Sequence, residues 1–421
     1  MKLNEFFKYI EQINTDCDLY NDLLLINNIN SYDNIDININ YSDFKNIVET
    51  YSEFRIPKIT CAILTYNEEK NIYKCISSIY DEFDEILILD SFSNDKTVNI
   101  IQTNFPKANI KFKSWEDDFS LSRNILIDSS QNNWIYFIDA DNYYNDLPNK
   151  FKKAVKLLDF IKFTGIASPI IIEFNNHKYT DNRKLFNKNN NIKFFGKVHE
   201  EPLKNNLVPK NITLNISIIH TGYDPKNVDM TKKTLRNIRL TKEMMNLEPQ
   251  NPKWIFFYCR ELYFLDKKST KDTILLLEKA LCLYEISSYK RYFIETLILL
   301  CDISIETRNI KVFKNSLVKL NKYFPSIIDT DYYNALLIYL DINRRISTLL
   351  YELNNLDESK PSFINSNNEH INMLKLDLYL KVNNIEELKK LCVKIKSSTN
   401  LKLLKNKLLE NKELLESINL N

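Results

Sequence analysis

Two aspartates separated by one residue, Asp139 and Asp141, directly follow the apolar run Trp134-Ile135-Tyr136-Phe137-Ile138. A buried strand that ends in Asp-Ala-Asp, with Ala140 in the middle, directs two carboxylates towards one point. Carboxylate oxygens are the ligands that hard divalent cations prefer, and such a cation can hold a diphosphate. Aspartate pairs also form turns after strands, so the pair alone does not separate a metal site from a turn.

Two strand-loop-helix units precede the aspartates. Residues 59–64 form an apolar run that stops at Thr65-Tyr66-Asn67-Glu68-Glu69, and residues 86–89 form a second run that stops at Asp90-Ser91. Apolar strands that alternate with amphipathic helices predict an α/β fold with a parallel sheet covered on both faces. Ligands of such sheets bind at the carboxyl ends of the strands. We therefore expect the polar residues after these strands to gather beside Asp139 and Asp141.

Glycine is too scarce for the common phosphate-binding loops. The whole chain has Gly165, Gly196 and Gly222 only, and it contains neither Gly-x-Gly-x-x-Gly nor a P-loop. Dinucleotide-dependent oxidoreductases and P-loop kinases are therefore disfavoured. A nucleotide would instead be held by side chains and a metal ion. Asp90 can accept a hydrogen bond from a ribose hydroxyl or a uracil N–H, or it can simply cap the turn that follows it.

These residues resemble the inverting family 2 glycosyltransferases of the GT-A fold. Three segments, residues 115–124, 139–142 and 196–202, are more closely similar to the S-glycosyltransferases that modify glycocin bacteriocins such as sublancin, and residues 247–254 extend the similarity towards the C-terminal part. The resemblance implies a UDP-hexose donor, glucose above all, and Mg²⁺ or Mn²⁺ as cofactor. It also implies an acceptor that is a cysteine thiol of a small, ribosomally made bacteriocin precursor peptide.

Carried onto this chain, the resemblance implies that Asn67, Asp90, Arg123 and Asp139 contact the nucleotide and ribose, and that Asp141 ligates the metal. An Arg123 guanidinium can pair with a donor phosphate, or it can form a structural salt bridge with Asp118. The residues expected to bind the nucleotide sugar are Thr65, Tyr66, Asn67, Glu68, Asp90, Ser91, Asp118, Arg123, Asp139, Ala140 and Tyr223.

The catalytic base is expected in His199-Glu200-Glu201, between Gly196 and Pro202. The family usually places its acceptor-activating carboxylate about this far beyond the metal motif. A cysteine thiol with a pKa of about 8.5 is only partly ionised at neutral pH, so a neighbouring base helps to form the thiolate. We favour Glu200 as the base and His199 as its orienting or substrate-contacting partner. Glu201 remains an alternative base, and a plain polar turn remains the non-catalytic alternative.

A third metal ligand is suggested by an alternating strand. Ile212, Leu214, Ile216 and Ile218 lie on one face of this strand, which ends at His220. Neutral imidazole is a good ligand for Mn²⁺ and a poorer one for Mg²⁺. His220 can therefore join Asp141 and Asp139 at a metal or bind a diphosphate oxygen, or it can be a structural residue at the end of the strand.

Composition excludes some partners. Lys plus Arg number 57 and Asp plus Glu number 55, so nonspecific nucleic-acid binding is not expected. The seven cysteines show no Cys-x-x-Cys spacing and are typical of reduced residues in a cytoplasmic protein. The chain starts without a signal-peptide pattern, and no run approaches the roughly 18 apolar residues of a membrane helix.

The chain is expected to have three parts. Residues 1–55 are expected to form a helical arm, residues 56–230 the GT-A domain, and residues 231–421 an all-α region with a degenerate TPR-like pattern. The helical region is a candidate for homodimer contact or peptide docking, or it only stabilises the protein. Two other functions stay open: transfer to a hydroxyl of a lipid phosphate or surface polysaccharide, and a non-catalytic nucleotide-sugar-binding scaffold.

Overall fold

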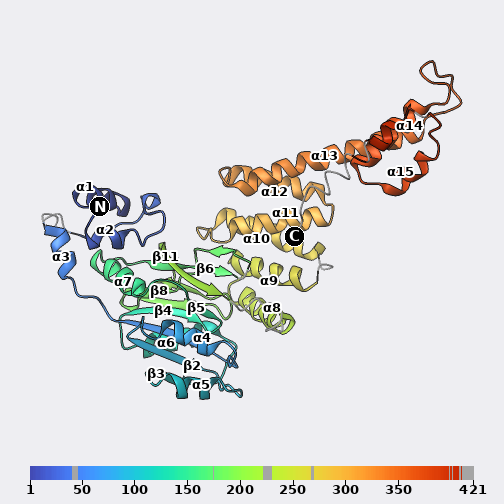
Figure 1. The fold of residues 1–421 in the computed structure, drawn as a ribbon. Helices are drawn as coiled ribbons and strands as arrows, with labels where there is room; N and C mark the ends of the chain where they lie inside the picture. The colour runs from blue at the N-terminus through green and yellow to red at the C-terminus, as the bar shows by residue number, and fades with distance from the viewer. Residues whose placement is uncertain are drawn as a thin grey trace. The chain divides into compact units, whose positions relative to one another are not determined.

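The computed structural model describes residues 1–39, 46–173, 175–220, 230–266, 270–397, 399–400, 402–406 and 409. It divides into two compact units, Met1–Tyr289 and Lys290–Asn421 (Figure 1). The first unit holds an α/β sheet and the helices around it, and the second is all-α. The predicted order, an α/β domain followed by a helical region, is confirmed, but the helices within residues 231–289 belong to the first unit. None of the helices in the described ranges is long and apolar enough to cross a membrane.

The sheet of the first unit has nine strands within the described residues, in the order β3-β2-β1-β4-β8-β6-β11-β5, with β7 paired to β6. A separate ribbon is formed by β9 and β10. The strands are β1 (Ile59–Thr65), β2 (Glu85–Asp90), β3 (Ala108–Phe112), β4 (Trp134–Asp139), β5 (Asn142–Tyr144), β6 (Ile166–Glu173), β7 (Lys178–Tyr179), β8 (Leu185–Asn187), β9 (Ile192–Phe195), β10 (Glu201–Lys204) and β11 (Asn211–His220).

The predicted parallel arrangement is correct for part of the sheet only. Strands β3, β2, β1 and β4 are parallel, as are β6 and β11. However, β8 runs antiparallel to β4 and β6, and β5 runs antiparallel to β11. Antiparallel strands need no crossover helix, so these short strands could enter the sheet without the helix signal on which the prediction rested.

The helices of the first unit are α1 (Leu3–Ile13), α2 (Asp18–Leu23), η1 (Ile29–Ser31), α3 (Ile47–Glu53), α4 (Ile72–Ile79), α5 (Thr97–Asn104), α6 (Phe119–Ser129), α7 (Lys150–Phe160), η3 (Lys188–Asn190), α8 (Met230–Leu247), α9 (Pro252–Leu265) and α10 (Thr270–Ile286). Those of the second unit are α11 (Phe293–Glu306), α12 (Ile310–Tyr323), α13 (Ile328–Asn354), α14 (Glu369–Lys381) and α15 (Ile385–Cys392).

Alternate residues of each central strand enter two different cores, because successive side chains of a strand point to opposite faces. On β1, for example, Cys61 and Ile63 pack with residues of α4, α5 and α7. Their neighbour Ala62 packs on the other face with α6 and β9. The sheet is therefore covered on both faces, which leaves the ends of its strands as the place where polar side chains can meet a ligand.

The N-terminal arm shares the core of the sheet. Phe6 and Ile10 of α1 are fully buried in the same cluster as the residues of β1, whereas Ile13 at the end of α1 is 49% exposed. The arm also joins β11, because Asn27 N donates to Thr213 O at 2.8 Å. It thus helps to hold the strand that carries His220.

Candidate active site

Three strands end side by side at the carboxyl edge of the sheet. Thr65 is in register with Asp90, and Leu64 with Asp139, so the ends of β1, β2 and β4 are neighbours. The hydrogen-bond ladder, and not local sequence, sets this arrangement. It brings together the polar residues that the sequence placed after separate strands.

The Asp139 carboxylate is held by two cations. Arg123 Nη2 donates to Oδ1 at 3.2 Å, and Lys184 Nζ forms an ion pair with Oδ2. Desolvation by itself would raise the pKa of Asp139, but Lys184 and Arg123 outweigh it and hold the pKa well below its usual range. The side chain is still 42% exposed, so a ligand can reach it. Both oxygens of Asp139 already have cationic partners. This favours a role in contacting the sugar donor over a role as a metal ligand.

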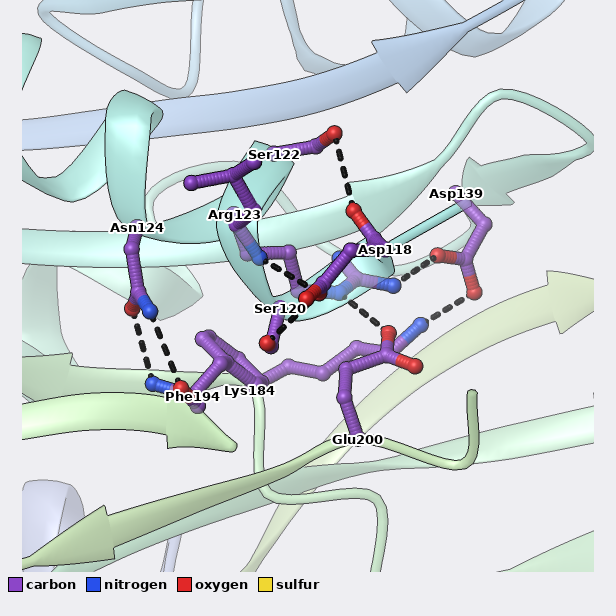
Figure 2. Close-up of polar contacts among 10 residues, drawn as sticks. Asp118, Ser120, Ser122, Arg123, Asn124, Asp139, Lys184, Phe194 and Glu200 are labelled. Atoms are coloured by element: carbon purple, nitrogen blue, oxygen red, sulfur yellow. Dashed lines mark hydrogen bonds and ion pairs between the residues drawn. The ribbon is translucent and has the colours of Figure 1, made fainter. Parts of the chain in front are cut away.

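Arg123 joins Asp139 to the predicted base. Its Nε donates to Glu200 Oε1 at 2.6 Å, and the two side chains are only 11% and 12% exposed. Figure 2 shows the guanidinium between the two carboxylates, with Lys184 beside Asp139. Its third nitrogen, Nη1, is buried and has no hydrogen-bond partner among the described residues. This unsatisfied donor is compatible with a further acceptor supplied by a ligand.

Asp118 does not form the salt bridge with Arg123 that was considered from the sequence. It caps α6, since its Oδ1 accepts from Leu121 N at 2.9 Å and from Ser120 Oγ at 2.7 Å. An N-cap carboxylate satisfies backbone N–H groups that have no partner within the helix. Asp118 therefore fixes the start of the helix that carries Arg123 (Figure 2).

Asp141 lies beside His220. The register of β5 with β11 pairs Asn142 with His220, and this brings His220 Nε2 to 3.2 Å from Asp141 Oδ2. On the other side of the imidazole ring, Nδ1 is 3.9 Å from Glu173 Oε1. The expected neighbourhood of Asp141 and His220 is thus present in the structure.

The fit of this pair to a metal ion rests on its donor chemistry. No group of three or more His, Cys, Asp or Glu side chains in the described ranges is arranged to hold a metal ion. Mg²⁺ is commonly bound by one or two carboxylates together with substrate phosphates and water. One carboxylate and one imidazole, Asp141 and His220, fit a cation that a diphosphate completes, and an imidazole ligand favours Mn²⁺ over Mg²⁺.

The loops after β1 and β2 are tied to each other. Asp90 is fully buried and accepts from Ser93 N at 2.7 Å, from Ser93 Oγ at 2.6 Å and from Thr65 Oγ1 at 3.3 Å. Asn67 has a φ of +56° and accepts from Asn94 N at 2.9 Å. These bonds show that Asp90 caps the turn that follows it, which is one of the two roles considered from the sequence. Ser91 joins this turn through its backbone, since Ser91 N donates to Thr65 O at 3.0 Å.

The remaining nucleotide-site candidates differ in exposure. Tyr66 is 56% exposed, whereas Ala140 is buried. Burial raises the pKa of Glu68, and the carboxylates of Asp141 and Asp139 raise it further. The carboxylates of Asp141 and Asp139 are therefore near enough to Glu68 to affect its ionisation.

Of the three candidate bases, only Glu200 forms an ion pair with Arg123. Glu201 Oε2 accepts from Lys253 Nζ at 2.8 Å and from Tyr289 Oη at 3.0 Å, in a buried pair. The His199 ring stacks on another aromatic ring, and burial lowers the pKa of His199 to about 4. Tyr223 lies outside the described residues.

Lys184 and Lys253 were not found from the sequence. Lys184 is 45 residues from its partner Asp139, and Lys253 is 52 residues from Glu201. Each is a single lysine in an unremarkable stretch. The only signal that bears on either residue is the similarity of residues 247–254, which includes Lys253 without giving it a role.

Comparisons with known proteins identify the family of the chain. The family "Glycosyl transferase family 2" matches residues 60–220. The SPbeta prophage-derived glycosyltransferase SunS of Bacillus subtilis (strain 168) is 37% identical over 400 residues, which cover 94% of each chain, and SunS of Bacillus phage SPbeta gives the same values. A crystal structure of Staphylococcus aureus TarS in complex with UDP-GlcNAc aligns with a TM-score of 0.33 and 15% identity over 63% of this chain and 91% of that chain. The match to SunS over nearly the whole of both chains shows that this protein belongs to the family 2 glycosyltransferases, in the group of SunS.

Proposed function

We propose that this glycosyltransferase moves a hexose, with glucose as the first candidate, from a UDP-sugar to a cysteine thiol of a small bacteriocin precursor peptide. The sugar is transferred with inversion at its anomeric carbon. The relation to SunS over 94% of the chain supports the transferase activity. The finer proposal follows from the resemblance and from one observation: Arg123 holds the Glu200 carboxylate and the Asp139 carboxylate at the same time.

In the proposed reaction the thiol sulfur attacks the anomeric carbon while the bond from that carbon to the diphosphate oxygen breaks. The thiol proton passes to Glu200, and UDP leaves with the electron pair of the broken bond. A carboxylate is a suitable base because the thiol needs only modest help to ionise at neutral pH. Arg123 fixes the position of this carboxylate through a bond of 2.6 Å, and a fixed position is what proximity effects require.

The donor would lie along the ends of β1, β2 and β4. We propose that the loops at Tyr66, Asn67 and Asp90 contact the uridine, and that Asp139 and the free Nη1 donor of Arg123 contact ribose or phosphate. Asp141 and His220 would hold Mg²⁺ or Mn²⁺. When bound, the cation would neutralise charge that develops on the departing diphosphate.

The all-α unit is proposed to bind the peptide or a second copy of the chain. Helix α13 exposes large apolar side chains at helical spacing, among them Ile328, Tyr332, Tyr339 and Ile342. A solvent-exposed apolar stripe of this kind is typical of helix-docking surfaces and of homodimer contacts. The buried, unpaired thiols of five of the seven cysteines support a reducing, cytoplasmic location as part of the same proposal.

The test is mass spectrometry of three peptides after incubation with UDP-glucose and Mn²⁺. One peptide contains the acceptor Cys, the second contains Ser in its place, and the third lacks both residues. We expect one hexose on the Cys peptide and much slower transfer to Ser, because a hydroxyl is far less acidic than a thiol. Equal hexose on all three peptides would exclude the thiol specificity. A faster reaction with a lipid phosphate or polysaccharide would favour the hydroxyl alternative, and UDP binding by titration without any turnover would favour the scaffold.

A further inference from the structure

One helix outside the family 2 match contacts the loop of the predicted base at several points. The loop, taken as residues 196–202, includes the first two residues of β10 and carries Glu200, and the helix is α9 (Pro252–Leu265). The loop joins β9 to β10, and this two-stranded ribbon is separate from the nine-stranded sheet. The ladder of the main sheet therefore does not fix the direction in which Glu200 points. Besides the β9–β10 ladder and the bond from Phe119 N to Lys197 O at 2.9 Å, side-chain contacts hold the loop.

The first contact is a buried ion pair. Lys253 Nζ donates to Glu201 Oε2 at 2.8 Å, with side-chain exposures of only 2% and 7%, and Tyr289 Oη donates to the same oxygen at 3.0 Å. Neither charge can move into water without losing its partner, so the pair holds Glu201 firmly. With Glu201 turned towards α9, its neighbour Glu200 is left to turn towards Arg123.

The second contact involves a glycine. Gly196 has a φ of +110°, and a Cβ built there would lie 2.6 Å from Cη2 of Trp254. The indole therefore lies directly against the loop backbone, where no other residue type fits. Trp254 is itself fixed, because its Nε1 donates to Glu248 Oε2 at 2.7 Å and its side chain is fully buried.

The third contact holds the residue before Glu200. The ring of His199 stacks on Phe257 with centroids 3.9 Å apart and planes 8° from parallel, and its Nε2 lies 3.4 Å from Glu261 Oε1. His199 also has a φ of +49°, a conformation that non-glycine residues adopt only when their surroundings enforce it. The stack and the carboxylate supply this enforcement.

The contacts on α9 come from positions 253, 254, 257 and 261, which lie on adjoining faces of about two helical turns. We infer that α9 is a positioning element of the active site, which orients the loop so that the Glu200 carboxylate meets Arg123. The inference rests on the proposed role of Glu200 as the base. It extends the catalytic part of the chain beyond residue 220, where the family 2 match ends. Lys253 and Phe257 act through Glu200 and are positioning residues.

The first experiment is a double-mutant cycle in the full-length chain. Lys253→Met is made alone and in a Glu200→Gln background, and kcat and KM are measured at a temperature at which every variant is folded. We expect Lys253→Met alone to lower kcat roughly 10–100-fold, the loss typical of a group misplaced by about 1 Å, and to change the KM for UDP-sugar by less than about twofold. In the Glu200→Gln background the same substitution should cost less than about threefold, because the residue it positions is already lost.

The controls separate positioning from general stability. Phe264 is on the same helix but is 70% exposed, so Phe264→Ala should leave kcat unchanged. Phe257→Leu removes the stack on His199 without leaving an unpaired buried charge, and it should show the same non-additive loss on a smaller scale. It serves as the second variant if Lys253→Met does not fold. Equal fold losses in both backgrounds, or an unchanged kcat in folded Lys253→Met, would overturn the inference.

A second measurement does not depend on turnover. Amide hydrogen exchange of residues 196–204 should become faster in Lys253→Met or Phe257→Leu, while exchange in β1 and β4 stays as in the parent chain. Unchanged exchange in the loop would also overturn the inference. Failure of the proposed function would look different: the parent enzyme would leave the Cys peptide unmodified, or Glu200→Gln would be fully active, even though loop exchange responded as expected.

Discussion

Arg123 donates to Glu200 at 2.6 Å and to Asp139 at 3.2 Å, across separations of 77 and 16 residues in the sequence. One guanidinium thus connects the end of a sheet strand to the loop of the predicted base. Burial opposes the charge on Arg123, but Glu200 and Asp139 outweigh burial and raise the pKa of Arg123. The fork of the guanidinium, with donors in fixed directions, is suited to hold two carboxylates at once.

We therefore predict that Arg123→Lys is not conservative. A lysine keeps the charge but cannot bond both carboxylates in the same geometry, so kcat should fall roughly 10-fold or more. Steady-state kinetics with a Cys peptide measures this. The matched control is Arg239→Lys, because Arg239 is 51% exposed and forms a surface pair with Asp117. Similar losses in both variants would argue against a special role for the Arg123 fork.

Glu200→Gln should lower kcat by roughly 10²–10⁴, as is typical when a general base is lost, while UDP affinity stays similar. The rate should partly recover as the pH approaches about 8.5, because solution then supplies the thiolate. Glu201→Gln is the comparison. It weakens the ion pair with Lys253, so its rate should fall without recovering at high pH. If the rate of Glu201→Gln recovered at high pH and that of Glu200→Gln did not, Glu201 would be the base.

Activity should need Mn²⁺ or Mg²⁺, with Mn²⁺ the better of the two because His220 supplies an imidazole. Asp141→Asn should lower kcat roughly 10²-fold or more while the thermal unfolding midpoint stays near that of the parent. Asp128→Asn is the control, since Asp128 is 69% exposed on the outer side of α6. Near-full turnover after treatment with EDTA would remove the metal from the mechanism.

His199 should make the protein less stable in weak acid. Burial lowers its folded-state pKa to about 4 from the ordinary value of about 6.5, so the unfolded chain binds the proton first as the pH falls. The contribution of neutral His199 to the free energy of unfolding is lost as the pH falls from about 6.5 to about 4. The pKa shift corresponds to a loss of roughly 3 kcal/mol at most. Urea unfolding at several pH values measures this. His199→Phe should flatten the profile in this window, and the exposed His177→Phe should not. Parallel profiles for all three proteins would show that His199 is not the group responsible.

A chain that ends at Tyr289 should keep the first compact unit, with α9 and the loop contacts intact. We expect it to bind UDP and to hydrolyse the donor slowly, but to lose peptide modification if the all-α unit docks the acceptor. A chain that ends at His220 would lack Lys253 and the rest of α9, so it would lose the contacts that hold the loop of Glu200. Full peptide activity of the shorter unit would exclude the docking role.

The buried elements could be predicted from the sequence because their patterns are local. The strands β1, β2, β4 and β11 are apolar or alternating runs that end at polar residues, and each was placed within about one residue of its observed bounds. The proximity of His220 to Asp141 followed from the same strand ends. Short strands such as β8 (Leu185–Asn187) were missed because three residues carry no measurable periodicity.

The partners of charged residues could not be predicted in this way. Asp118 is close to Arg123 in the sequence, but the first turn of α6 uses its carboxylate as a cap. Arg123 pairs with Glu200 and Asp139 instead, because the folded sheet and the β9–β10 ribbon bring these two carboxylates to the guanidinium. Pairings such as Lys253 with Glu201 depend on the docking of whole elements, which no local pattern encodes.

The pairing of β5 with β11 also determines when the site can form. Asp141 and His220 are 79 residues apart, and β11 is held in place by β6 and by the N-terminal arm. Contacts between distant segments form late, because the entropy of closing a long loop opposes them until neighbouring strands are in place. During synthesis on the ribosome, the ends of β1, β2 and β4 can therefore be ordered before the proposed metal site is complete. A nascent chain stalled before residue 220 would carry the proposed uridine contacts but would lack His220, one of the two proposed metal ligands.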